Sequence, residues 1–202
     1  MVLLVFWIPQ PWQQILWGLT AAIILAIILD SFDNLKTMGL CRENLSCSLW
    51  AVFVALGVAA VAVTAARMMH TLQVPGNTLS FLRHSFAYAL WASIQQLVLQ
   101  CFFLSRLMRL IGSGPWAAGA AAILFAIAHL PSPFLMLVTL VCGLAACLFF
   151  LRYRSLYPLV IAHAILGIVI AITVPERVDH QMRVGLAYLT YSSQQPASLS
   201  QP

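Results

Sequence analysis

Three glutamines lie close together in the middle of an apolar stretch that covers residues 86–104. A side-chain amide in lipid hydrocarbon loses its hydrogen bonds to water and must find partners inside the protein. Ser93, Gln96 and Gln100 recur at helical spacing and so share one face of a helix, and Gln95 precedes Gln96 directly. We therefore expect this polar stripe to face other helices or a wet cavity, where amides can orient water or donate hydrogen bonds.

Two histidines also fall within apolar stretches. His129 ends one such stretch and His163 lies deep within another. An imidazole titrates near neutral pH and can act as a general base, and polar groups within a membrane are often functional because they are costly to insert. A structural role stays open, because His129 could cap its helix and the glutamines could simply join helices. No carboxylate falls inside a predicted span; the acidic residues are Asp30, Asp33, Glu43, Glu176 and Asp179.

The composition indicates an integral membrane protein. Of the 202 residues, 62% are hydrophobic and 7% are charged, and the mean hydropathy is +0.96. Soluble domains carry about a quarter charged residues. The net charge of +5 belongs to short loops, so we expect contact with the headgroups of the lipid bilayer and no nucleic-acid partner. The five cysteines form no disulfide or metal-binding pattern.

Six apolar segments are long enough, or nearly so, to cross a bilayer, which takes about 20 residues. The expected fold class is all-α, a polytopic transmembrane helical bundle of about six helices that forms one domain over residues 1–174. Residues 175–190 could lie along the membrane surface, and residues 191–202, rich in Ser, Gln and Pro, are expected to be disordered. The predicted spans are residues 12–29, 49–66, 86–104, 115–130, 134–151 and 156–174, of which the fourth is short and ends at a proline-rich break.

Three short motifs on separate predicted helices resemble the motif series of one membrane family. They are Gln95-Gln96-x-x-x-Gln100, Phe125-x-x-x-His129 and His163-x-x-x-Gly167. Their order and placement resemble the E-E-x-x-x-R, F-x-x-x-H and H-x-x-x-N pattern of the CPBP family, the CAAX-protease-like and bacteriocin-processing intramembrane endopeptidases. Residues 37–45 are similar to the linker before that family's second core helix, so the resemblance covers roughly residues 35–170.

The resemblance implies a site and a function. In the CPBP family, paired glutamates and two histidines line a cavity within the membrane, and one glutamate activates a water. The implied partner is a membrane-embedded or prenylated peptide or protein, the implied location is the inner (plasma) membrane of a prokaryote, and zinc is implied only by family analogy. The resemblance places catalytic positions at Gln95, Gln96, His129 and His163, and cavity positions at Ser93, Gln100, Phe125 and Gly167.

The residues at these positions predict weakened proteolysis. Glutamines stand at both glutamate positions, Gln100 stands at the arginine position and Gly167 at the asparagine position. A glutamine can orient a water but cannot take its proton, and losing a general base costs about 10²–10⁴ in rate. Because an arginine without carboxylates would be a stranded charge, the neutral Gln100 keeps the charge balance. We expect an intramembrane endopeptidase-like protein that acts on or binds membrane peptides and is weak or inactive in proteolysis, either a pseudoenzyme or a hydrolase with a histidine base.

Two interpretations from other functional classes stay open. His129 and His163 on two helices suit bis-imidazole ligation of haem b, or a quinone site. A purely structural membrane subunit would use the glutamine stripe as hydrogen bonds between helices. A zinc site is disfavoured, because catalytic zinc normally takes three protein ligands and the predicted core offers two histidines without a carboxylate.

Overall fold

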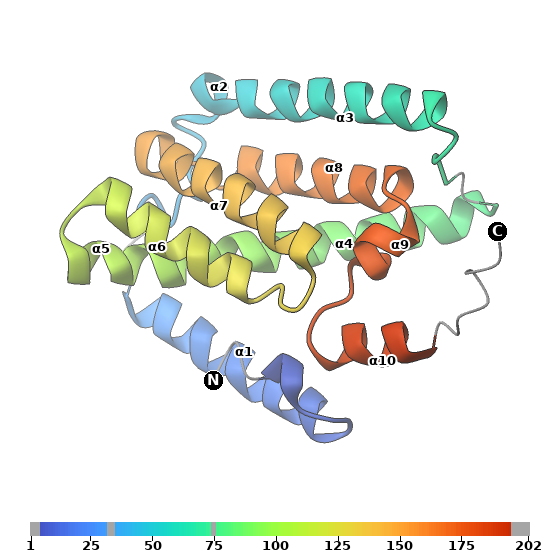
Figure 1. Ribbon diagram of the computed structural model, residues 1–202. Helices are drawn as coiled ribbons and strands as arrows, with labels where there is room; N and C mark the ends of the chain where they lie inside the picture. Colours follow the sequence, from blue (N-terminus) through green and yellow to red (C-terminus); the bar gives the residue numbers. More distant parts are fainter. Residues whose placement is uncertain (1–4, 32–34, 74–75, 195–202) are drawn as a thin grey trace.

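The computed structural model describes residues 5–31, 35–73 and 76–194. Within these ranges the chain forms helices joined by turns and loops, without strands, so the prediction of an all-α bundle is confirmed. The main helices are α1 (Trp12–Ser31), α3 (Trp50–Met68), α4 (Thr78–Leu97), α6 (Gly114–Ile127), α7 (Pro133–Tyr153) and α8 (Tyr157–Thr173). In the view of Figure 1, α3 lies at the top, α8 runs beneath it, and α1 lies at the bottom.

The lengths of these helices fit a membrane protein. Among the described residues, four helical segments are long and apolar enough to cross a bilayer, namely residues 12–30, 45–68, 78–111 and 133–153. The second of these includes the short helix α2 (Leu45–Ser48). A fifth span results if α8 is counted with the helical segment Glu176–Met182, to which it is bent by 118°. α6 has 14 residues and is the short fourth segment of the sequence. The chain is therefore an integral membrane protein, and its described residues form six principal apolar helices.

The helix that contains the third predicted span, residues 86–104, is longer than predicted. α4 begins at Thr78, where the Asn77 side chain accepts a hydrogen bond from the Ser80 backbone N–H at 3.1 Å. The helix continues through the π-helical segment η2 (Val98–Leu104) and α5 (Ser105–Ile111) before Gly112, with φ of +70°, ends it. The pattern missed both extensions because they contain basic and hydroxyl residues that lower the local hydropathy.

Small residues bring α6 and α7 close together beside this long helix. Ala117 and Ala121 of α6 are completely buried. A Cβ atom added to Gly143 of α7 would lie 3.2 Å from the Phe125 ring and 3.7 Å from the Cα atom of Ala122. Close backbone approach increases the van der Waals contact that holds membrane helices together. This packing fixes Phe125, one of the predicted cavity residues.

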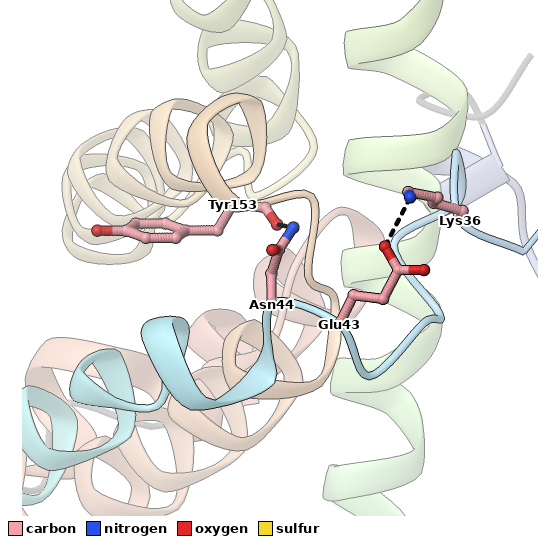
Figure 2. A network of polar contacts seen from close by, with 4 residues as sticks. All are labelled: Lys36, Glu43, Asn44 and Tyr153. Atoms are coloured by element: carbon pink, nitrogen blue, oxygen red, sulfur yellow. Dashed lines mark hydrogen bonds and ion pairs between the residues drawn. The ribbon is translucent and has the colours of Figure 1, made fainter.

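The loop of residues 35–44, which precedes α2, is held against the end of α7. The Asn44 side-chain amide donates a hydrogen bond to the Tyr153 carbonyl oxygen at 2.8 Å, and Lys36 pairs with Glu43 at 2.6 Å (Figure 2). The Glu43 carboxylate raises the pKa of Lys36 above its usual value through a hydrogen bond and its charge. The loop therefore supports the turn from which α8 begins.

After α8 the chain turns back along the bundle. α9 (Glu176–Asp179) and η3 (His180–Met182) lead to α10 (Leu186–Gln194). The Gly185 backbone N–H donates to the Leu130 carbonyl oxygen at 2.7 Å, which ties this segment to the residue after His129. These elements cover the predicted interfacial segment, residues 175–190. The predicted tail starts at residue 191, inside α10, and residues 195–202 lie outside the described residues.

Candidate functional site

A cavity of about 940 Å³ lies among α1, α3, α4, α6, α7 and α8. Its wall is mainly apolar, and polar side chains reach it from α4, α8 and the end of α6. Gln100 lies outside the wall and is 1% exposed. The structure thus brings seven of the eight predicted site residues to one cavity: Ser93, Gln95, Gln96, Phe125, His129, His163 and Gly167.

A chain of hydrogen bonds leads from the buried interior to this wall. The Gln100 amide Nε2 donates to Gln96 Oε1 at 3.1 Å, as expected for residues one helical turn apart. This bond turns the Gln96 amide nitrogen toward α8, where it lies 3.1 Å from His163 Nδ1. Gln100 Oε1 is buried without a hydrogen-bond partner among the described residues. The amides therefore hold His163 in place, and one carbonyl oxygen remains unpaired.

The π-helical segment η2 begins two residues after Gln96. Leu99, Gln100 and Cys101 are consecutive, and each is at most 1% exposed, so this stretch is enclosed on several faces. π-Helical turns in α-helices are uncommon and frequently occur at functional sites. The wider turn gives the cavity a tightly packed base behind Gln96.

His129 lies two residues after the end of α6, and its side chain lines the cavity. Its Nδ1 atom lies 2.7 Å from the Phe125 carbonyl oxygen. A carbonyl oxygen only accepts hydrogen bonds, so Nδ1 carries the proton and Nε2 keeps its lone pair. The Phe125 ring packs edge-on against both imidazoles, with centroid distances of 4.9 Å to His129 and 6.2 Å to His163. Phe125 therefore spaces the two histidines across one corner of the cavity.

The remaining predicted residues have more local roles in the structure. The Ser93 hydroxyl donates to the Ala89 carbonyl oxygen of its own helix at 2.8 Å. Gln95 is half-buried at the cavity wall. A Cβ atom at Gly167 would overlap the Tyr88 ring and hydroxyl, so the glycine is the notch into which Tyr88 fits.

The cavity has further wall residues that the sequence analysis did not identify. Tyr88 of α4 stands beside His163 with a ring centroid distance of 6.3 Å. Trp17 of α1 packs edge-on against Trp91 of α4 at 5.3 Å, and both line the cavity. A motif search passes over them because aromatic residues are common in any membrane helix. The signal that could have found Tyr88 is its spacing of eight residues before Gln96, which places it near the same helix face.

Comparison with known protein families agrees with the motif resemblance. Residues 77–169, which contain all eight predicted site positions, match the family described as Type II CAAX prenyl endopeptidase Rce1-like. This segment is a CPBP-family domain. Comparisons with curated proteins and with solved structures gave no match. The CPBP-family domain starts just before α4 and ends within α8, so it includes every helix that carries a motif.

The donor set of this CPBP-family domain does not fit a zinc site. No group of three His, Cys, Asp or Glu side chains suited to a metal ion occurs in the part of the chain that the structure describes. His163 Nδ1 is taken by Gln96 and His129 Nδ1 by a backbone carbonyl. Two imidazoles remain, one ligand short of the usual catalytic zinc set. The cavity chemistry available from these residues is hydrogen bonding and proton transfer at imidazole nitrogens.

Proposed function

We propose that this CAAX-protease-like protein holds a membrane peptide substrate in its cavity and hydrolyses it weakly or not at all. The family match supports the protease-type architecture. The glutamines at positions 95 and 96 support the loss of hydrolysis, because an amide cannot accept a proton from water. The proposed protein is therefore a peptide-binding relative of an endopeptidase, located in the inner (plasma) membrane of a prokaryote.

The hydrogen bond between Gln96 and His163 carries the proposal. Because the Gln96 amide donates to Nδ1 of His163, the proton of that imidazole is on Nε2. His129 has the opposite tautomer, with its lone pair on Nε2. A base and a donor are thus available at one cavity, as hydrolysis of an amide requires. His129 would have to activate water without a carboxylate, at a cost of about 10²–10⁴ in rate.

The apolar wall favours a peptide that is itself in the membrane. Phe6, Trp17 and Trp91 form a row of edge-on aromatic contacts, with centroid distances of 5.1 Å and 5.3 Å, and all three line the cavity. Such a surface buries an apolar chain, while the polar corner satisfies backbone groups that lipid cannot. A membrane-embedded or prenylated peptide or protein has both features.

Photocrosslinking tests whether a peptide enters the cavity. The probe is a single-span leucine-rich peptide with one diazirine-bearing leucine, mixed with the wild-type protein in detergent micelles and irradiated. We expect labelling of α7 residues at the cavity wall, such as Thr139 and Cys142, that excess unlabelled peptide suppresses. The labelled peptide should have its intact mass.

Two variants control for non-specific contact. Thr139→Trp places a bulky ring in the cavity and should abolish the suppressible labelling. Val61→Trp adds the same ring to the outer face of α3, where Val61 is 71% exposed, and should leave labelling unchanged. Labelling that is equal at Val61 on the outer face of α3 and at Thr139 in the cavity wall, or that both variants leave intact, contradicts peptide binding. Rapid cleavage of the probe by the wild-type protein contradicts the proposed loss of hydrolysis.

A further inference from the structure

Tyr88 occupies the space that a side chain at position 167 would otherwise fill. A Cβ atom built on Gly167 would lie closer to the hydroxyl oxygen, Cζ and Cε1 atoms of Tyr88 than any non-bonded contact distance allows. The outer end of the phenol therefore lies directly against the α8 backbone, one helical turn after His163. A glycine at this position is what allows α4 to present a tyrosine here.

The phenol also brings a hydrogen-bond donor to the cavity. Tyr88 and His163 both line the cavity, and their rings meet edge-on at 6.3 Å with an interplanar angle of 73°. No described residue forms a hydrogen bond with the Tyr88 hydroxyl. A tyrosine hydroxyl in apolar surroundings usually has a partner. The unpaired hydroxyl beside a second donor, the Nε2–H of His163, is suited to a carbonyl oxygen of a ligand.

We infer that Tyr88 contacts the substrate by donating a hydrogen bond to a peptide carbonyl oxygen held beside His163. This inference rests on the proposed function, since it needs a peptide in the cavity. In the motif that the chain resembles, position 167 carries an asparagine amide; here the phenol of α4 fills that volume from the opposite helix. Gly167 and Tyr88 act as one unit, in which the glycine supplies the space and the tyrosine supplies the donor.

A carbonyl vibration reports this hydrogen bond directly. The probe is N-acetyl-Leu-Leu-Leu-amide with a ¹³C label at the central carbonyl, bound to the full chain in detergent micelles. Infrared difference spectra compare the wild type with Tyr88→Phe, which keeps the ring in the Gly167 notch and removes only the hydroxyl. Tyr153→Phe is the matched control, because Tyr153 lies at the end of α7 outside the cavity wall.

We expect the labelled carbonyl to absorb at lower wavenumber in the wild type and in Tyr153→Phe than in Tyr88→Phe. The affinity of the probe should fall by about 2- to 10-fold in Tyr88→Phe, the effect of one neutral hydrogen bond. A probe that binds all three proteins with the same affinity and the same carbonyl band overturns the role of Tyr88 and leaves the proposed function standing. A probe that the wild type does not bind at all overturns the proposed function and, with it, this inference.

Discussion

Gly167 should tolerate an added methyl group only when Tyr88 is absent. In an ordinary helix interior, Gly→Ala stabilises by about 0.5–1 kcal/mol because it removes conformational freedom from the unfolded chain. At Gly167 the new Cβ would overlap the Tyr88 hydroxyl and ring, so the phenol must leave its place. Overpacking of this kind costs about 1–3 kcal/mol. We therefore expect Gly167→Ala to lower the free energy of unfolding by about 0–2 kcal/mol.

The sign of the effect should reverse in a Tyr88→Ala background. There the methyl group enters vacated space, and Gly167→Ala should stabilise by about 0.5–1 kcal/mol. The coupling between the two positions is then about 1–3 kcal/mol in a double-mutant cycle. Unfolding by SDS titration in mixed micelles, followed by circular dichroism, measures all four proteins.

A matched glycine gives the reference value for this cycle. Gly57 of α3 has no atom within 4 Å of an added Cβ, so Gly57→Ala should show the helix-propensity gain alone. If Gly167→Ala stabilises the wild type as much as Gly57→Ala does, Tyr88 does not fill the notch and the assignment of the pair is wrong.

Further predictions concern the supporting structure and the alternative functions. Gly39 has φ of +74°, and an added Cβ would lie 2.6 Å from the Phe150 ring, so Gly39→Ala should lower the free energy of unfolding by about 1–3 kcal/mol in the same titration. Gln96→Leu should lower the free energy of unfolding by about 1–3 kcal/mol, because the substitution leaves the buried amide of Gln100 and the Nδ1 atom of His163 without their partners. Gln100→Leu should lower the free energy of unfolding by less, since this substitution also removes the unpaired Oε1 atom of Gln100. Equal losses in the two variants would contradict the hydrogen-bond chain. Purified protein that is incubated with haem and then freed of unbound haem by gel filtration should show no Soret band, because Phe125 packs against both imidazoles. A bis-histidine spectrum in the protein fraction would support the haem interpretation instead.

The sequence pattern alone was sufficient to predict a membrane protein and to predict that the three motifs come together. In lipid, the backbone hydrogen-bonding groups of an apolar segment of spanning length are satisfied within a helix, so the all-α bundle was predictable. Burying the polar side chains of Gln96 and His163 in hydrocarbon is unfavourable unless they form a hydrogen bond with each other. In the structure, Gln96 Nε2 lies 3.1 Å from His163 Nδ1. The cost of burying polar groups thus connects positions that are 67 residues apart in the chain.

Other features depend on packing that a single sequence does not reveal. The π-helical segment Val98–Leu104 has no local sequence signal, and the helix extension over residues 78–85 has a low average hydropathy. Tyr88 is identified as a site residue only from the structure, which places it against Gly167 of the neighbouring helix. Gln100 was expected at the cavity wall, but it lies behind Gln96, because it belongs to the π-helical segment η2, whose residues at this point are buried in the core.

Restoring the carboxylates tests most directly whether the cavity is an endopeptidase site that has lost its base. The double variant Gln95→Glu, Gln96→Glu is compared with the wild type for cleavage of the single-span peptide, measured as product mass over time. Gln10→Glu, Gln14→Glu adds the same two charges at exposed positions of the N-terminal segment and serves as the matched control.

We predict that the double variant cleaves the peptide about 10²–10⁴ times faster than the wild type and the control. The gain should disappear when His129→Ala is added, because that imidazole shares the activation of water. Equal cleavage by the wild type and the double variant, with the peptide bound to both, would contradict the account.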